Sequence, residues 1–414
     1  MRSLSITKIP LRCMWLAVLV CTVYQSYRYP LQMNSAGTSP TYKDTPAALQ
    51  AAKYVITAII CLISIMYIPR RLLSYRNWGL ACLVFCMSSY AILKAIVAQG
   101  GDRASYVDIA FWPILALILA ISVRSVSISA LDRYLRFVLL YGLASTAIQI
   151  VLFLAIGRLP ALAYEGSFSV RFGGFLDDPN GFAALIFMLM GWAYFRFTKA
   201  KRVAVELSLL ICLALTQSLT AFVFLGLLIL LFSARQFIRR PPLFIGGCVS
   251  LGLILLAALP SLQSNLSAII ADHSGSVEDH LSQVVAAAWK TPFDLLLGGS
   301  NYVSMESWWI GSLFNFGILW YLVCILVVIT LAWQSIKAYR RAGGTLNKGV
   351  SGAVLGLTCY FIFGCINLPL FKIFPINFLY FFLSFLVCFD RIRNDDEDYP
   401  CLSYSRSRPL SANV

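Results

Sequence analysis

Apolar runs long enough to cross a membrane recur along the whole chain, and short polar breaks separate them. A spanning helix needs about 20 apolar residues, because each residue adds about 1.5 Å and the hydrocarbon layer is about 30 Å thick. With 59% hydrophobic and only 12% charged residues, the chain has too little charge to cover a soluble domain. The sequence therefore predicts an all-α polytopic membrane protein with twelve transmembrane helices. The predicted spans are 11–27, 51–69, 78–98, 107–123, 135–157, 181–198, 203–218, 221–237, 243–260, 307–333, 350–367 and 369–389.

The distribution of Lys and Arg residues sets the expected orientation. If the N-terminus lies in the cytoplasm and twelve spans alternate, most of the 33 basic residues fall in cytoplasmic segments, and most of the 18 acidic residues fall outside. Cytoplasmic loops of membrane proteins carry this excess of Lys and Arg. We therefore expect both termini in the cytoplasm. The net charge of +15 is then a topology signal, and no nucleic acid is expected as a partner.

The polar segments divide the chain into one membrane domain over residues 1–393 and a polar cytoplasmic tail over 394–414 that we expect to be disordered. The largest outer loop, between spans 9 and 10, contains both histidines. Apolar residues between Val277 and Trp289 recur there at helical spacing, which predicts an amphipathic helix on the membrane surface. The long outer segments are 28–52, 158–180 and 261–306.

The stretch Arg171–Asn180 concentrates charged and turn-forming residues between two predicted spans. The Arg171 guanidinium would either reach the lipid headgroups or hold a phosphate with two parallel hydrogen bonds. Gly174 would let the backbone approach such an anion closely. Asp178 or Asn180 would cap the next helix, whose first N–H groups would add donors for the same anion. The functional interpretation is an anion-binding site on the outer face.

Three carboxylates near the outer face are candidates for a general base or for binding a substrate hydroxyl: Asp177, Asp178 and Glu306. Two adjacent side chains cannot point the same way, so Asp177 and Asp178 do not form a glycosidase-like pair. The structural alternative is that one of them caps the next helix and the other pairs with Arg171. Glu306 opens a span, where the helix dipole alone already favours a carboxylate.

The remaining charged candidates are His280 and Lys290 in the loop 261–306, and Lys94 within a span. A histidine on a surface helix is often simply solvated. Lys94 would either reach the outer interface or pair inside the bundle. The chain has no HExxH motif, no other zinc-ligand spacing, no P-loop and no outer DxD motif. We therefore expect neither a metal nor a nucleotide cofactor.

Three stretches of the chain resemble the bacterial O-antigen ligase and polymerase family of polytopic glycosyltransferases. Arg171-x-x-Gly174-x-x-x-x-Pro179-Asn180-Gly181 is similar to the family's arginine–glycine–Pro-Asn signature at the entrance of a span. Leu215–Ala221 is similar to its Thr-x-Ser-Arg-Gly-Ala turn, although the Arg-Gly pair is missing. Residues 280–320 resemble its large periplasmic loop and the helix after it, through Trp289, Pro292, Leu297-Gly298-Gly299, Glu306-Ser307 and Gly317.

The resemblance implies a metal-independent, cofactor-free glycosyltransferase in the bacterial inner membrane. Its implied substrates are polyprenyl-pyrophosphate-linked oligosaccharide repeat units, which it would polymerise into exopolysaccharide or O-antigen on the periplasmic side. Implied partners, besides membrane lipids, are the flippase and the chain-length regulator of the same pathway. The implied catalytic residues are Arg171, Glu306, Asp177 and Asp178. The implied substrate-binding residues are Gly174, Asn180, His280, Lys290 and Trp308, the last by stacking on sugars.

Two departures from the family pattern bear on the activity. The ligases carry a histidine where this chain has Glu306, which favours a polymerase. The family often has an arginine where His280 aligns, and Lys290 is the candidate substitute as the second phosphate-binding residue. The alternatives are a ligase that transfers finished glycan to another acceptor, and a transporter or flippase for polysaccharide precursors. Inverted repeats would favour transport, but the two halves of the sequence show no convincing repeat.

Overall fold

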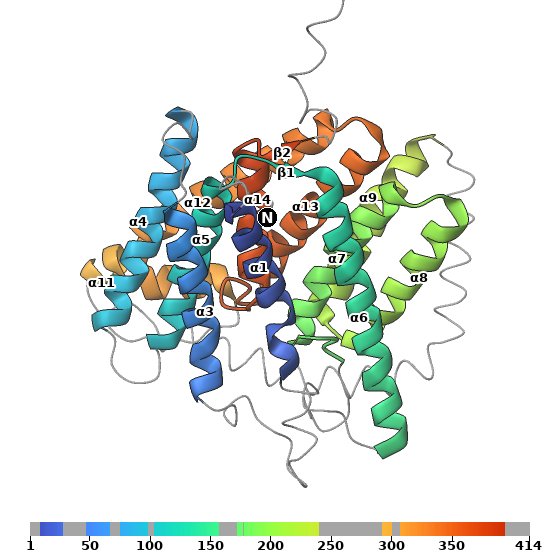
Figure 1. Ribbon diagram of the computed structural model, residues 1–414, viewed down its shortest axis with the longest axis horizontal. Helices are drawn as coiled ribbons and strands as arrows, with labels where there is room; N and C mark the ends of the chain where they lie inside the picture. Colours follow the sequence, from blue (N-terminus) through green and yellow to red (C-terminus); the bar gives the residue numbers. More distant parts are fainter. Residues whose placement is uncertain are drawn as a thin grey trace, which may run out of the picture.

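The computed structural model describes residues 9–27, 47–66, 75–97, 103–156, 172–176, 178–239, 292–299 and 307–393, and these form a helical bundle (Figure 1). The α-helices are α1 (Ile9–Val23), α3 (Ala47–Ile65), α4 (Tyr75–Val97), α5 (Arg103–Ser122), α6 (Ile128–Ile156), α7 (Pro179–Arg196), α8 (Lys199–Thr216), α9 (Leu219–Arg239), α11 (Pro292–Leu297), α12 (Trp308–Arg341), α13 (Gly344–Gly364) and α14 (Ile376–Cys388). A 3-10 turn, η2 (Tyr24–Tyr27), extends α1, and β1 (Val126–Ser127) pairs in parallel with β2 (Ile392–Arg393).

The helices confirm the all-α prediction, because eleven of the twelve predicted apolar segments coincide with a helix. Five of the helices in the described part of the chain are long and apolar enough to cross a membrane: α4, α5, α6, α12 and α13. The segment 243–260, the surface helix expected at 277–289 and the tail 394–414 lie outside the described residues. Several boundaries differ from the predicted ones: α6 begins at Ile128 and not at 135, and α12 continues to Arg341 and not to 333. The last helix begins at Ile376 and not at 369, because Pro369 and Pro375 bracket a turn there.

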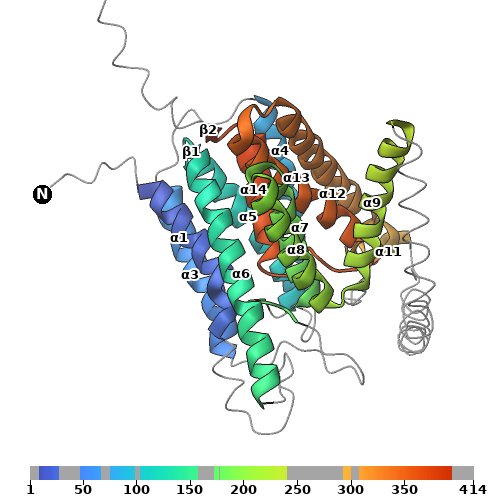
Figure 2. The same ribbon diagram turned by 90° about the vertical axis from the view of Figure 1, so that its right-hand side faces the viewer.

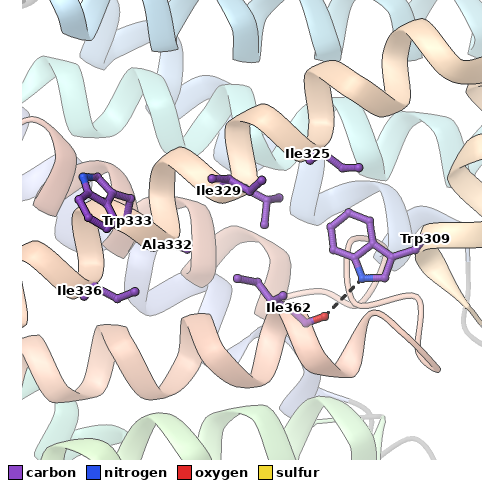
Figure 3. A pocket seen from close by; sticks show the side chains of 8 residues that line it. Trp309, Ile325, Ile329, Ala332, Trp333, Ile336 and Ile362 are labelled. Carbon is purple, nitrogen blue, oxygen red and sulfur yellow. Dashed lines mark hydrogen bonds between the residues drawn. The ribbon is translucent and has the colours of Figure 1, made fainter.

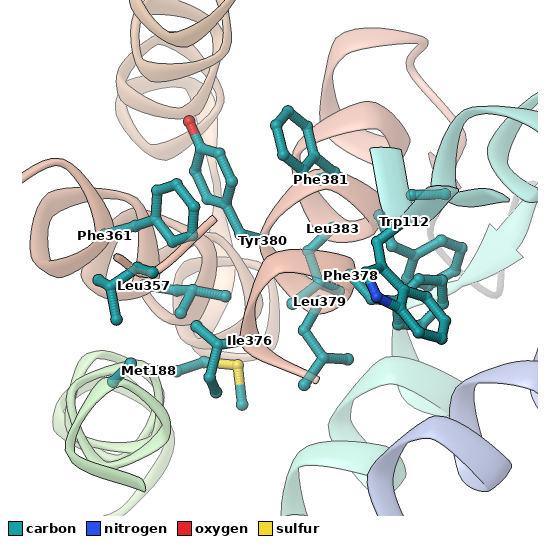
Figure 4. Packing of buried hydrophobic residues seen from close by; sticks show 14 of the residues in the cluster. Trp112, Met188, Leu357, Phe361, Ile376, Phe378, Leu379, Tyr380, Phe381 and Leu383 are labelled. Atoms are coloured by element: carbon teal, nitrogen blue, oxygen red, sulfur yellow. The ribbon is translucent and has the colours of Figure 1, made fainter. Parts of the chain in front are cut away.

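The core of the bundle is built around α14, whose side chains are almost all buried, and around α7, which is buried over most of its first three turns. Aromatic rings fill the space between α14 and α13, where Phe361 and Tyr380 stack with their centroids 3.9 Å apart (Figure 4). The buried side chain of Met188 extends from α7 toward Leu357 of α13 and Ile376 of α14 (Figure 4). The helix α14 is therefore buried on every face, which explains why its sequence is apolar without a polar stripe.

The two ends of the bundle are distinguished by the elements they carry. We call the end with β1 and β2 the strand end, and the opposite end, where α6 ends and α7 begins, the Gly174 end (Figure 2). At the strand end, Arg391 donates to the carbonyl of Arg124, which ties the end of α14 to the start of α6. All of these segments are among those predicted to be cytoplasmic, so the predicted inner ends of α5, α6 and α14 meet at one end of the bundle.

A buried carboxylate joins α6 to α7 at the strand end. Asp132 is 4% exposed and pairs with Arg136 on its own helix and with Arg196 at the end of α7. Its Oδ1 accepts hydrogen bonds from Arg196 Nε at 2.8 Å and from Trp192 Nε1 at 3.0 Å. Two guanidinium groups and an indole therefore compensate the desolvation of one carboxylate.

We expect Asp132→Ala to destabilise the protein by about 1–3 kcal/mol, because it leaves the buried Trp192 N–H without an acceptor and removes the partner of two guanidinium groups. The measurement is the melting temperature of the purified protein in detergent. Glu206→Ala is the matched control, since Glu206 pairs with Arg202 on one partly exposed helix face and its loss is expected to cost about 1 kcal/mol or less. Equal shifts for the two variants would contradict the stabilising role of Asp132 between α6 and α7.

Candidate functional site

The turn that follows Arg171 is held against α6 by its backbone. Gly174 has φ of +61°, a left-handed conformation that disfavours side chains, and its N–H donates to Oε1 of buried Gln149 at 3.0 Å. A Cβ added to Gly174 would lie 2.5 Å from the ring of Phe182. Phe175 is fully buried and contacts the same ring. The glycine expected from the sequence is thus required here by both its φ angle and its tight packing.

Asp178 caps the N-terminus of α7. Its Oδ1 accepts the Asn180 N–H at 2.8 Å, and Pro179 occupies the first helical position. The sequence left open which residue caps this helix, and the structure assigns the cap to Asp178. One oxygen of Asp178 is therefore engaged by the backbone, which gives this carboxylate a structural role that differs from the catalytic one expected. Asn180 lies half-buried in the first turn.

The second motif, Leu215–Ala221, forms the turn between α8 and α9, as the sequence predicted. Gln217 adopts a left-handed conformation with φ of 48° and ends α8. Thr216 Oγ1 accepts the Ser218 N–H, and Ser218 Oγ accepts the Ala221 N–H at the start of α9. The N–H of Phe172 donates to the Leu215 carbonyl at 3.0 Å. The first and second motifs are therefore in direct contact at the Gly174 end.

The third motif brings α11 into a kink of α12. Gly317 has φ of +77° and ψ of 174° inside α12, where the helix changes direction. A Cβ added to Gly317 would overlap the carbonyl of Leu296, and a Cβ added to Gly298 would overlap the carbonyl of Asn315. The two glycines that the sequence singled out on either side of Glu306 therefore interlock, and neither position has room for a side chain.

Lys94 pairs inside the bundle, which decides between the two expectations for this residue. Its Nζ donates to the carbonyls of Gly298 and Gly299 at 2.9 and 3.0 Å. Tyr90, one turn earlier on α4, donates to the Leu297 carbonyl. The end of α11 thus receives donors from two side chains of α4.

A connector that the sequence analysis did not identify, residues 365–375 between α13 and α14, links the motifs. In the sequence, its short polar break resembles an ordinary boundary between two spans. The signal was present in Asn367 and in two prolines within ten residues. Three contacts join it to the motif segments: the Cys365 carbonyl accepts the Trp308 N–H at 3.0 Å, Asn367 Nδ2 donates to Thr220 Oγ1 at 3.3 Å, and the Ile373 side chain packs on Gly181 of α7.

Trp308 is 3% exposed, which contradicts the expected stacking on a sugar. Its ring stacks on Phe371 of the connector with centroids 4.5 Å apart and also packs against Trp320. No ring face is open to a ligand in this arrangement. The reason is local, because α12 begins at Trp308, with Ser307 as its cap, and the first turn packs directly on the connector.

Five expected site residues lie outside the described part of the chain: Arg171, Asp177, His280, Lys290 and Glu306. Their roles stay predictions. Three of them have a described neighbour in the sequence, namely Phe172, Asp178 and Ser307. Each of these neighbours belongs to a segment at the Gly174 end, where the contacts above join the motifs.

An apolar groove of about 360 Å³ runs along α12 beside α13 (Figure 3). Trp309 lies at one end of the groove, and its Nε1 donates to the Ile362 carbonyl at 3.3 Å. Trp333 and Ile336 lie at the other end, further along α12. The lining residues are Trp309, Ile325, Val328, Ile329, Ala332, Trp333, Ile336 and Ile362. The groove is lined by apolar side chains, and one of its ends lies at Trp309 in the first turn of α12.

A scan of the sequence against models of known protein families returns no match, and a search of curated proteins likewise returns none. The function of this chain is therefore inferred from its residues and their arrangement.

Proposed function

We propose that this chain is a glycosyltransferase of the bacterial inner membrane that polymerises polyprenyl-pyrophosphate-linked oligosaccharide repeat units on the periplasmic side. One observation carries the proposal. Of the three stretches that resemble the O-antigen ligase and polymerase family, the first and second are in contact at the Gly174 end through Phe172 and Leu215. The connector 365–375 joins the second and third through its Asn367–Thr220 and Cys365–Trp308 contacts. Stretches that lie far apart in the sequence and pack together at one end of the bundle can contribute residues to a shared active site.

The proposed topology has twelve spans, both termini in the cytoplasm, and the Gly174 end facing the periplasm. The contacts between helix ends support this alternation. Gln25 after α1 donates to the Phe374 carbonyl before α14, and Tyr54 in α3 donates to Asp108 in α5, all at predicted outer ends. The basic residues Arg136, Arg196 and Arg391 lie at the strand end, as cytoplasmic loops prefer.

The proposed ninth span, 243–260, is supported by the ends that flank it. The helix α9 starts at the Gly174 end, beside the end of α8, and runs toward the strand end. The helix α11 lies at the Gly174 end, against Tyr90 and Lys94 near the end of α4. The described chain therefore stops at the strand end after α9 and resumes at the Gly174 end with α11. One further crossing between residues 239 and 292 would connect these two ends.

The apolar groove suits the polyprenyl tail of the substrate. Its lining is aliphatic and aromatic, and it runs along α12, which is long and apolar enough to cross a membrane. A tail in the groove would place its pyrophosphate beyond Trp309, at the start of α12 and at the proposed periplasmic end. Burial of the hydrocarbon chain along α12 would hold the carrier across the membrane and leave its charged group at the end of the groove.

The proposed reaction transfers the growing glycan between two carriers. The bond between the anomeric carbon and the pyrophosphate oxygen breaks, and a bond from that carbon to a hydroxyl oxygen of the incoming repeat unit forms. The hydroxyl proton passes to a carboxylate, for which Glu306 and Asp177 are the candidates. The Arg171 guanidinium stabilises the charge on the departing polyprenyl pyrophosphate. The bond that breaks already carries an activated leaving group, so the reaction needs no nucleotide.

The direct test is a polymerisation assay with purified protein in lipid nanodiscs and one defined polyprenyl-pyrophosphate-linked oligosaccharide. We expect a ladder of products that differ by one repeat unit, with release of one polyprenyl pyrophosphate per bond formed. Transfer that occurs only after addition of a separate glycolipid acceptor would indicate a ligase. Movement of the intact substrate across vesicle membranes without any ladder would indicate a flippase, and either result would overturn the proposal.

A further inference from the structure

We propose that Lys94 is a positioning residue, which clasps the end of α11 and thereby fixes the start of α12. This inference rests on the proposed function, since its catalytic consequence acts through Glu306. The Lys94 ammonium donates to two successive carbonyls, those of Gly298 and Gly299, at 2.9 and 3.0 Å. These carbonyls follow the last residue of α11, where the helix leaves its final acceptors unsatisfied.

A lysine within an apolar helix is costly unless it has a specific partner. The window of α4 that qualifies as a span contains Lys94, three residues before its end. The C-terminal end of a helix carries partial negative charge, which favours a cation there. The carboxylate of Asp294 at the start of α11 adds a further attraction for the ammonium. Tyr90 donates to the preceding carbonyl, that of Leu297, so three successive carbonyls receive donors from α4.

The turn at Gly298 and Gly299, which Lys94 holds, contacts the kink of α12 at Gly317. The N–H of Gly299 donates to the Phe314 carbonyl at 2.9 Å. The interlock of Gly298 with Gly317 leaves no space for the turn to move independently of the kink. Beyond the kink, Trp320 Nε1 donates to the Met87 carbonyl of α4 at 2.8 Å. Thus α4 holds α12 both directly and through the turn.

The part of α12 before the kink, 308–316, is therefore fixed relative to α4. Ser307 caps this part, and Glu306 is the residue before the cap. A shift of the turn would displace the start of α12 together with the carboxylate expected to receive the acceptor proton. Misplacing a catalytic group by about 1 Å can cost on the order of 100-fold in rate.

The test compares Lys94→Met with Lys94→Arg in nanodiscs. Methionine keeps the apolar stem but removes the donors, whereas arginine keeps the charge and can still donate to two carbonyls. For Lys94→Met we expect kcat for polymerisation to fall by roughly 10- to 100-fold with KM for the lipid-linked substrate unchanged. For Lys94→Arg we expect most of the rate to return.

Backbone hydrogen exchange supplies a readout that does not depend on activity. We expect Lys94→Met to accelerate exchange over 292–299 and 307–317 only. Lys53→Met is the matched control, because Lys53 is also a partly buried lysine at the Gly174 end but pairs with Asp108 of α5. We expect that variant to leave exchange over 292–299 unchanged.

Unchanged exchange in Lys94→Met would overturn the clasp. Faster exchange with an unchanged kcat, or a raised KM with an unchanged kcat, would overturn the positioning role. If the unmodified protein makes no polymer, the proposed function fails and the positioning role fails with it, while the exchange data still decide whether the clasp exists.

Discussion

Replacing Arg171 with alanine is expected to abolish polymer synthesis while single lipid-linked repeat units are still made and exported. A guanidinium can hold a phosphate through two parallel hydrogen bonds and can stabilise the charge that develops as the pyrophosphate departs. Loss of one such contact typically costs roughly 10²- to 10³-fold in kcat. The next residue, Phe172, donates its backbone N–H to the Leu215 carbonyl of the second motif, so the backbone that follows Arg171 has a fixed position at the Gly174 end.

Two measurements check this result. Polymer length in the native host reports the activity in the cell, and the ladder assay reports it with purified protein. Arg171→Lys is expected to recover only a small part of the rate, because an ammonium cannot form the bidentate contact. Arg158→Ala is the matched control, since Arg158 belongs to the same outer segment but not to the motif. Normal polymer in Arg171→Ala would exclude this site, and loss of repeat units from the periplasmic leaflet would indicate a flippase.

The helices themselves were predictable, because each needs only a local pattern of apolar residues. The turn chemistry was predictable for the same reason. Asp178-Pro179 begins α7, and Gln217-Ser218 separates α8 from α9 within the expected residues. Short-range rules of capping and backbone conformation decide these features, and a sequence displays them directly.

The assembly of the candidate site was only partly predictable, because it depends on contacts between residues far apart in the chain. The sequence singled out Gly298 and Gly317, but nothing in it showed that each would lie against the other's segment. The same limit explains Trp308, whose expected open ring face is covered by Phe371 from the connector. Lys94 had two equally reasonable environments until α11 was placed beside α4. Packing partners, and not local propensity, decided all three.

A close contact between α7 and α13 is a further feature that the sequence carried in a recognisable form. Gly349, Gly352 and Gly356 lie three and four residues apart, so they share one face of α13. Small residues at such spacing allow helices to approach closely in membranes. In the structure, this face meets α7 at Gly191 and at the backbone of Phe187. The glycine spacing alone predicts a close helix contact but does not identify α7 as the partner.

We expect Gly352→Leu to prevent correct folding, the largest effect on stability of any substitution considered for this chain. A Cβ at Gly352 would overlap the carbonyl of Gly191, and a Cβ at Gly191 would overlap the carbonyl of Gly352. The obstacle is backbone on both sides, so no side-chain rotation relieves it. The cost should exceed the roughly 1–3 kcal/mol typical of overpacked cores, because the two helices must separate. Since α7 bears the Asp178 cap and α13 leads into the connector, their separation would also dismantle the candidate site.

Size-exclusion chromatography of detergent extracts and the melting temperature of the soluble fraction measure this effect. Gly352→Ala should give an intermediate loss, because its single methyl group already meets the Gly191 carbonyl. Gly226→Leu is the matched control: it places the same side chain on α9, where an added Cβ has nothing within 4 Å. We expect this variant to elute and melt like the unmodified protein. If Gly352→Leu behaves like Gly226→Leu, the helices α7 and α13 do not touch through their backbones, and the packing that supports the Gly174 end is different from the one described.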